Sequence, residues 1–128
     1  MKTNRLVEED FFKLVVESSP NGIIITDNKG KIIIVNKHAE KMFGYKPAEL
    51  TDKKVELLIP ANFRKNHQKY RSSFSTHPEN RPMGADRNLF ALHKSGKEFP
   101  VEIGLSHITT DKGLFILATV IDLSLIHI

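Results

Sequence analysis

One row of side chains on a predicted helix holds the group in this sequence most able to do chemistry, an imidazole. Phe63, His67, Tyr70 and Phe74 follow the spacing i, i+4, i+7, i+11, so all four project from one side of an α-helix. Neutral imidazole is a common ligand of heme iron, and heme needs an apolar surrounding. His67 is therefore interpreted in two ways, as a cofactor ligand or as a hydrogen-bonded core residue. The core role is the more frequent one for a single histidine in an apolar row.

The residue types that are missing exclude other kinds of chemistry. The sequence has no cysteine, which rules out disulfides, thiolate catalysis, iron–sulfur clusters and cysteine-linked chromophores. None of the six histidines stands at a zinc-site spacing from another histidine or a glutamate. No nucleophile with an adjacent base and no glycine-rich phosphate loop stands out, so we expect no enzymatic activity in this segment.

The composition is that of one soluble globular domain. The chain has 128 residues, of which 40% are hydrophobic and 27% charged, and its net charge is +4. The basic residues are scattered among acidic ones without a recognised binding motif, so we expect no nucleic-acid binding. The N-terminus lacks the apolar core of a signal peptide, and the longest apolar runs are too short to cross a bilayer. We therefore expect a cytoplasmic segment without membrane contact.

Periodicity and turn residues predict an α+β order of elements. Helices or helical turns are predicted over residues 6–18, 37–43, 47–50, 55–58 and 60–76, and strands over 22–26, 31–35, 87–92, 98–109 and 114–123. Residues 79–85 are polar and are predicted to form a loop. Consecutive hairpins favour an antiparallel sheet of five strands with the helices packed on one face.

The later strands predict an apolar pocket beneath those helices. Alternation along a strand places every second side chain on the same face of the sheet. The side chains expected to line the pocket are Leu89, Ala91, Val101, Ile103 and Leu105. Arg87 shares the parity of Leu89, so its side chain is expected to point toward the same cavity.

The N-terminal helix carries an apolar stripe of its own. Leu6, Phe11, Leu14 and Val15 follow helical spacing. This stripe has two interpretations: it covers the outer face of the chain's own sheet, or it packs on a second copy of the chain. We expect a homodimer on the second interpretation.

Four stretches of the sequence resemble the motifs of PAS domains, and together they span nearly the whole chain. They are Ser18-Ser19-Pro20-Asn21-Gly22-Ile23 with Thr26-Asp27, Val35-Asn36-Lys37-His38-Ala39-Glu40 with Met42-Phe43-Gly44-Tyr45, Arg81-Pro82-Met83-Gly84 with residues 94–103, and Val120-Ile121-Asp122-Leu123-Ser124. Their order agrees with the order of elements above. Thr51 and Asp52 stand where the family often has a glycine, so a local difference is expected at that turn.

The resemblance implies a sensory input module of the kind found in bacterial signalling proteins such as sensor histidine kinases. Such a module binds a small ligand or cofactor and relays its state to an output domain, for example a kinase, a cyclase or a transcription factor. The implied division is a flanking helix over residues 1–18, the PAS domain over 19–124, and the start of a connector over 125–128.

The resemblance also sharpens the interpretation of His67. In the oxygen-sensing heme PAS domains, the iron ligand lies on this helix, a tyrosine follows three residues later, and an arginine twenty positions after the ligand faces the bound gas. His67, Tyr70 and Arg87 match that spacing. Other PAS domains with the same Arg-Pro-Met-Gly stretch carry histidine and arginine here without heme. Non-covalent flavin, a small metabolite or fatty acid, and a ligand-free dimerisation or scaffold domain are the alternatives.

Overall fold

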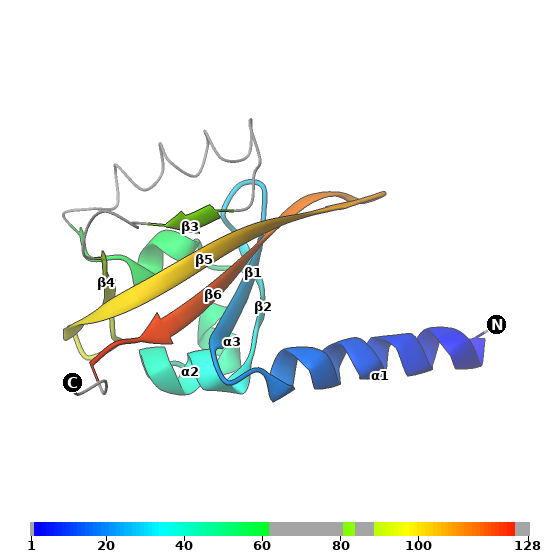
Figure 1. Cartoon of the computed structure of the whole chain (residues 1–128), viewed down its shortest axis with the longest axis horizontal. Helices are drawn as coiled ribbons and strands as arrows, with labels where there is room; N and C mark the ends of the chain where they lie inside the picture. The colour runs from blue at the N-terminus through cyan, green and yellow to red at the C-terminus, as the bar shows by residue number, and fades with distance from the viewer. Residues whose placement is uncertain (1, 62–80, 84–88, 125–128) are drawn as a thin grey trace.

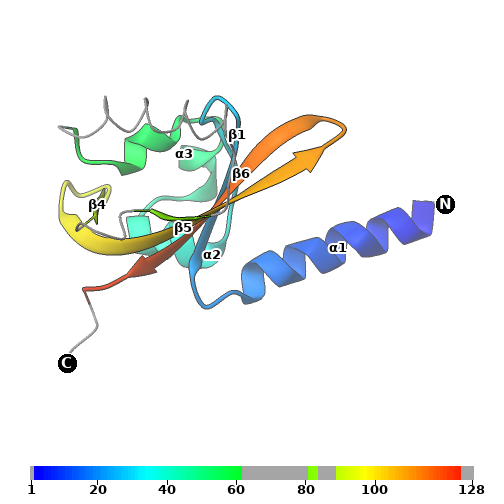
Figure 2. The ribbon, with the colours of Figure 1, turned by 45° about the horizontal axis from the view of Figure 1, so that its top comes forward.

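The computed structural model describes residues 2–61, 81–83 and 89–124, with the backbone alone at 2–9 and 81–83. Its elements in chain order are α1 (Lys2–Ser18), β1 (Gly22–Asp27), β2 (Ile32–Val35), α2 (Lys37–Phe43), α3 (Pro47–Leu50), the 3₁₀ helix η1 (Val55–Leu58), β3 (Arg81–Met83), β4 (Leu89–Leu92), β5 (Glu98–Thr110) and β6 (Gly113–Asp122). A twisted sheet has α2, α3 and η1 on one side, while α1 extends away from the body (Figures 1 and 2). The predicted α+β fold with an antiparallel sheet is confirmed.

The strands are ordered β2-β1-β6-β5-β3, and β4 also pairs with β5. All pairs are antiparallel. β4 lies along the start of β5 with Leu89 opposite Val101, and β3 lies further along with Arg81 opposite Leu105. The five predicted strands are all present, and β3 is an additional one. It falls inside residues 79–85, which the polar composition had predicted to be a loop, so that prediction is wrong at residues 81–83. A proline is tolerated on a short edge strand of this kind.

The helix α2 has both of its ends fixed by local sequence. Asn36 has extended backbone angles and its side chain accepts a hydrogen bond from the N–H of Ala39, as an N-cap does. Gly44 ends the helix with φ of 78°, the left-handed conformation that glycine adopts without strain. A Cβ at this position would also lie 2.3 Å from Nε2 of His93. Glycine is therefore required at residue 44 for two separate reasons.

The turn after α3 keeps the backbone conformation of glycine without having one. Asp52 has φ of 69°, in the left-handed region. Aspartate is one of the few non-glycine residues that enters this region with a modest cost. Its carboxylate lies 3.4 Å from Nζ of Lys31. The turn at which this sequence departs from the family pattern therefore contains a non-glycine residue with a positive φ.

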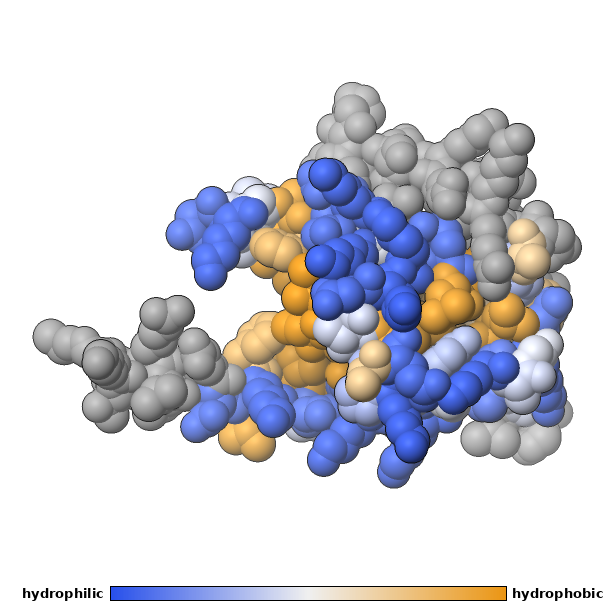
Figure 3. All heavy atoms as spheres, turned by 180° about the vertical axis from the view of Figure 1, so that it is seen from behind, coloured by the Kyte–Doolittle hydropathy of each residue, from blue (hydrophilic) through white to orange (hydrophobic). Residues whose placement is uncertain are grey.

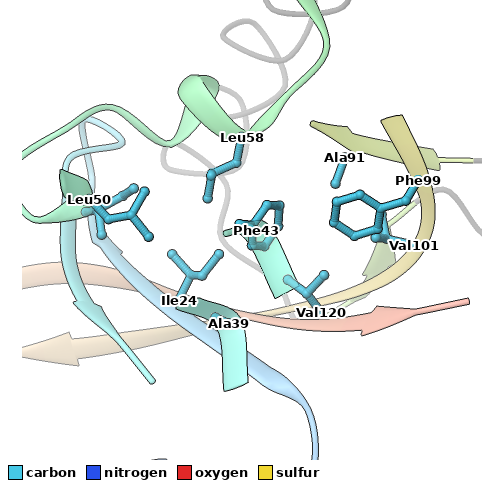
Figure 4. Packing of buried hydrophobic residues seen from close by; sticks show 10 residues of the cluster. Ile24, Ala39, Phe43, Leu50, Leu58, Ala91, Phe99, Val101 and Val120 are labelled. Atoms are coloured by element: carbon cyan, nitrogen blue, oxygen red, sulfur yellow. The ribbon is translucent and has the colours of Figure 1, made fainter. Parts of the chain in front are cut away.

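The main core lies between the helices and the inner face of the sheet. Its buried members come from every described layer: Ile24, Ile32, Ala39, Phe43, Leu50, Leu58, Ala91, Phe99, Val101 and Val120. Figure 4 shows most of them pointing toward one another. The rings of Phe43 and Phe99 meet at a centroid distance of 5.5 Å with an interplanar angle of 59°. Burying a side chain of this size stabilises the fold by about 1.5–3 kcal/mol.

A second, smaller apolar cluster occupies the outer face of the sheet. Val16 of α1 packs there with Ile23 and Ile25 of β1, and Ile34, Phe115 and Leu117 flank them. The neighbouring side chains of α1 do not take part, because Phe11 and Leu14 are 66% and 67% exposed. Among the side chains that the structure describes, most of the stripe on α1 therefore stays exposed and does not pack on the chain's own sheet, although Ile23 and Ile25 beneath Val16 are buried.

Candidate ligand-binding face

The predicted pocket lining gathers mainly in one place on the inner face. Ala91 and Val101 are buried members of the main core, and Leu89 and Ile103 pack against it while keeping some exposure. Leu105 is half-buried further along β5, opposite Arg81 of β3. The parity of the strands thus placed four of the five residues in one cluster and the fifth beyond its edge.

The residues proposed to hold heme are not among the described ones. Phe63, His67, Tyr70 and Phe74 lie in the segment 62–80, and Arg87 lies in the segment 84–88, both outside the described residues. The spacing of His67, Tyr70 and Arg87 therefore remains a prediction from the sequence.

The inner face differs between its two ends. Near α2 it is filled by the chain's own side chains, since Phe43 and Phe99 pack ring against ring and both are buried. Toward β3, the inward-facing residues Ile103 and Leu105 retain partial exposure. The α2 end of the inner face is therefore closed by the contact of Phe43 with Phe99, and the described side chains at the β3 end are less fully buried.

A polar clasp holds the β4–β5 turn against the short helices. The backbone N–H of Lys94 donates to the carbonyl of Phe43 (2.9 Å), and its Nζ reaches Oε2 of Glu49 and lies 5.8 Å from the ring centre of Tyr45. The hydrogen bond from Lys94 lowers the pKa of Glu49. This clasp was missed from the sequence because its partners are 45 residues apart. It ties the strand end of α2 at Phe43 to the β4–β5 turn.

Two further observations concern metal binding and membrane-spanning helices. Within the described ranges, no group of three or more His, Asp or Glu side chains is placed to hold a metal ion. No helix in the same part of the chain is both long and apolar enough to cross a bilayer.

The comparison with protein families decides the assignment of this fold. The family model described as a PAS domain matches residues 20–124. The chain belongs to the PAS domain family. As a PAS domain it is a sensory module for signal transduction rather than a catalytic domain.

Its relatives are much longer proteins. The PAS domain is 38% identical over 90 residues to a probable serine/threonine-protein kinase of Dictyostelium discoideum, covering 70% of this chain and 6% of the relative. It is 25% identical to the sensor protein FixL of Bradyrhizobium diazoefficiens, over 76% of this chain and 19% of the relative. Identity to the oxygen sensor protein DosP of Escherichia coli is 27%, over 89% of this chain and 14% of the relative. The chain thus spans less than a fifth of each of these proteins.

Solved structures agree on the fold. The PAS domain of an HTR-like protein from Haloarcula marismortui superposes with a TM-score of 0.78 at 23% identity, covering 94% of this chain and 97% of that one. A PAS domain from a two-component sensor histidine kinase gives 0.73 at 15% identity, covering 92% and 98%. At these identities the likeness establishes the fold alone.

Proposed function

We propose that this PAS domain binds a small apolar ligand or cofactor at the β3 end of its inner face and relays the bound state to an output domain outside this sequence. The observation that carries the proposal is the uneven filling of the inner face. Phe43 and Phe99 close one end, whereas Ile103 and Leu105 remain partly exposed at the other. Apolar side chains left open on an inward face are typical of a ligand site.

Heme is the ligand that we propose to test first. The spacing of His67, Tyr70 and Arg87 supports it, and so does the similarity to a protein named as an oxygen sensor. The lining that the structure describes is apolar at Leu89 and Ile103, which suits a porphyrin. When bound, heme would supply an iron atom able to take a diatomic gas. His67 would hold the iron, and Tyr70 and Arg87 would lie near it.

The test is an absorption spectrum of the purified domain titrated with hemin. We expect a Soret band at one hemin per chain, and we expect His67→Ala to abolish that band. His38→Ala is the matched control, because His38 is an exposed histidine on α2 and its loss should leave the band unchanged. A domain that ignores hemin would overturn the heme assignment. Flavin binding, measured from the flavin absorption band, or fatty-acid binding, measured as a rise in the unfolding midpoint, would then identify the ligand class.

The second candidate function is a ligand-free dimerisation or scaffold domain. The close packing of Phe43 on Phe99 favours it, because a core filled in this way needs no ligand. It predicts that neither hemin, flavin nor fatty acids change the unfolding midpoint of the domain. Stabilisation by any one of them at saturation would exclude it.

The exposed stripe on α1 supports a homodimer. Phe11, Leu14 and Val15 are exposed on a helix that extends from the body, and the outer face of the sheet carries its own apolar cluster. Seen from behind, the surface is hollowed between α1 and the β5–β6 hairpin, with hydrophobic residues along the hollow (Figure 3). A second copy would cover both surfaces at once.

We further propose that residues 1–18 flank the domain proper, that 19–124 form it, and that 125–128 lead toward the output domain in the cytoplasm.

A further inference from the structure

The end of α1 and the start of α2 cap each other. The first N–H groups and the last carbonyls of any helix lack partners within that helix. Asn36 accepts the N–H of Ala39 in α2 (2.9 Å), and its Nδ2 donates to the carbonyl of Val16 in the last turn of α1 (3.0 Å). Glu17 of that same turn accepts the N–H of Lys37, the first residue of α2 (2.8 Å). Each helix thus supplies a group that satisfies the other's free end.

Asn36 uses its whole hydrogen-bonding capacity in this junction. Its Oδ1 also accepts the N–H of Ile23 (2.9 Å), and its Nδ2 also donates to the carbonyl of Asn21 (3.1 Å). The side chain is 0% exposed. An asparagine amide offers two donors and two acceptor sites, so all four are satisfied here. Rotation of α1 away from α2 would leave buried polar groups without partners, which makes the junction a two-sided linkage rather than a loose contact.

The other end of α2 belongs to the inner core. Ala39 and Phe43 are buried there, and Phe43 packs on Phe99 of β5. Gly22 leaves room for this arrangement, because a Cβ on it would lie 3.3 Å from the side chains of Ala39 and Met42. A seven-residue helix therefore connects the inner core at one end with a hydrogen-bonded contact to α1 at the other.

We infer that α2 couples the inner face to α1, with Asn36 and Glu17 as the positioning residues that transmit the coupling. The mechanism is a change in the strength of the junction, which biases the orientation and the fraying of the last turn of α1. This inference concerns the relay step of the proposed function. It holds for any ligand, so a negative hemin titration leaves it intact.

The experiment measures amide hydrogen exchange in the last turn of α1 by NMR on the full 128-residue chain. Phe43→Leu perturbs the inner end of α2. This substitution is made alone, and it is also combined with each of two further substitutions that remove a hydrogen bond between α1 and α2. Glu17→Ala removes the carboxylate cap, and Asn36→Ser keeps an oxygen for the N–H of Ala39 but lacks the amide that reaches Val16. If Asn36→Ser does not fold, Glu17→Ala alone decides the test, since Glu17 is not part of the core.

We expect Phe43→Leu to speed exchange in the last turn of α1 by about threefold, near the lower end of couplings within one hydrogen-bond network. When Phe43→Leu is added to Glu17→Ala or to Asn36→Ser, the exchange rate in the last turn of α1 should stay the same as in that single variant. Glu17→Gln retains an acceptor and should preserve the effect. Ile116→Val, a buried change on β6 outside the inner cluster, should have none, which controls for a general loss of stability. The inference would be overturned if Phe43→Leu speeds exchange equally when Glu17 or Asn36 is also substituted. It would also be overturned if Phe43→Leu does not speed exchange in the otherwise unchanged chain.

Discussion

The two faces of the sheet carry the same kinds of side chain but, among the described residues, bury clusters of very different size, ten residues on the inner face and three on the outer face. On the inner face, α2, α3 and η1 bury the core so fully that Ile32 and Leu50 are 0% exposed. On the outer face, Val16 joins the cluster from the part of α1 whose side chains are described, while Phe11 and Leu14 there are exposed. The comparison shows that alternation along a strand decides which face a residue occupies. Burial depends instead on what covers that face.

The largest expected effect lies on the covered face. Phe43→Ala removes a ring packed against Phe99, and a substitution of this type costs about 3–5 kcal/mol in the free energy of unfolding. Phe11→Ala removes the same atoms from an exposed position and should cost less than about 0.5 kcal/mol. Urea unfolding of both variants measures the contrast. Equal losses would show that the two faces are not covered as differently as described.

The next largest effect is expected at Gly44, which ends the helix α2 over the inner face of the sheet. Gly44→Ala forces a left-handed φ on alanine and places a methyl group against His93, so it should cost about 1–3 kcal/mol. Gly96→Ala is the matched control for φ alone, because Gly96 also has a positive φ but nothing lies within 4 Å of its added Cβ. Thermal unfolding of the two variants separates strain from contact. An equal loss at both positions would rule out a role for His93.

A smaller change in stability but a clear change in assembly is expected on the open face. Leu14→Glu puts a charge into the exposed stripe and should weaken self-association at least about tenfold, while monomer stability changes by less than about 0.5 kcal/mol. Lys13→Glu changes charge at a neighbouring exposed position and should leave association intact. Sedimentation equilibrium measures both. A Leu14→Glu variant that still associates as the unchanged chain does would exclude this surface as the dimer contact.

The smallest effect concerns the clasp at the rim of the covered face. The pKa of Glu49 is lowered by its hydrogen bond from Lys94, so the pair stabilises the fold above the ordinary pKa of a glutamate. That contribution is lost as the pH falls through the lowered pKa of Glu49. Glu49→Gln should therefore slightly reduce the thermal midpoint at neutral pH and match the unchanged chain at acid pH. A difference that stays constant across the titration would contradict this account.

Local sequence patterns were sufficient to predict most elements but not all of the pairings. The helix at 37–43 was predicted with its observed bounds, because an asparagine before it and Gly44 after it fix both ends locally. β3 was missed because Arg81-Pro82-Met83 shows no alternation. It exists only through its pairing with β5, some twenty residues further on.

In the candidate site, too, local features were predicted from the sequence and long-range contacts were not. Parity along single strands placed Ala91 and Val101 on the inner face, where both are buried. Asn36 was predicted as an N-cap from its position, but its bonds to Val16 and Asn21 were not, since they join groups 20 and 15 residues apart. Contacts of that span depend on the tertiary fold, which short-range periodicity does not encode.

The mutual capping of α1 and α2 has a consequence for how this domain can be recombined. A chimera that grafts a foreign leader onto residue 19 would discard the carboxylate of Glu17, and it would keep a carbonyl at position 16 within reach of Asn36 only if the leader ends in a helix placed like α1. Where the leader displaces that carbonyl, one of the two N–H groups of the buried Asn36 amide would lack its acceptor. A domain exchange that preserves these hydrogen bonds must therefore include at least the last turn of α1 together with the domain.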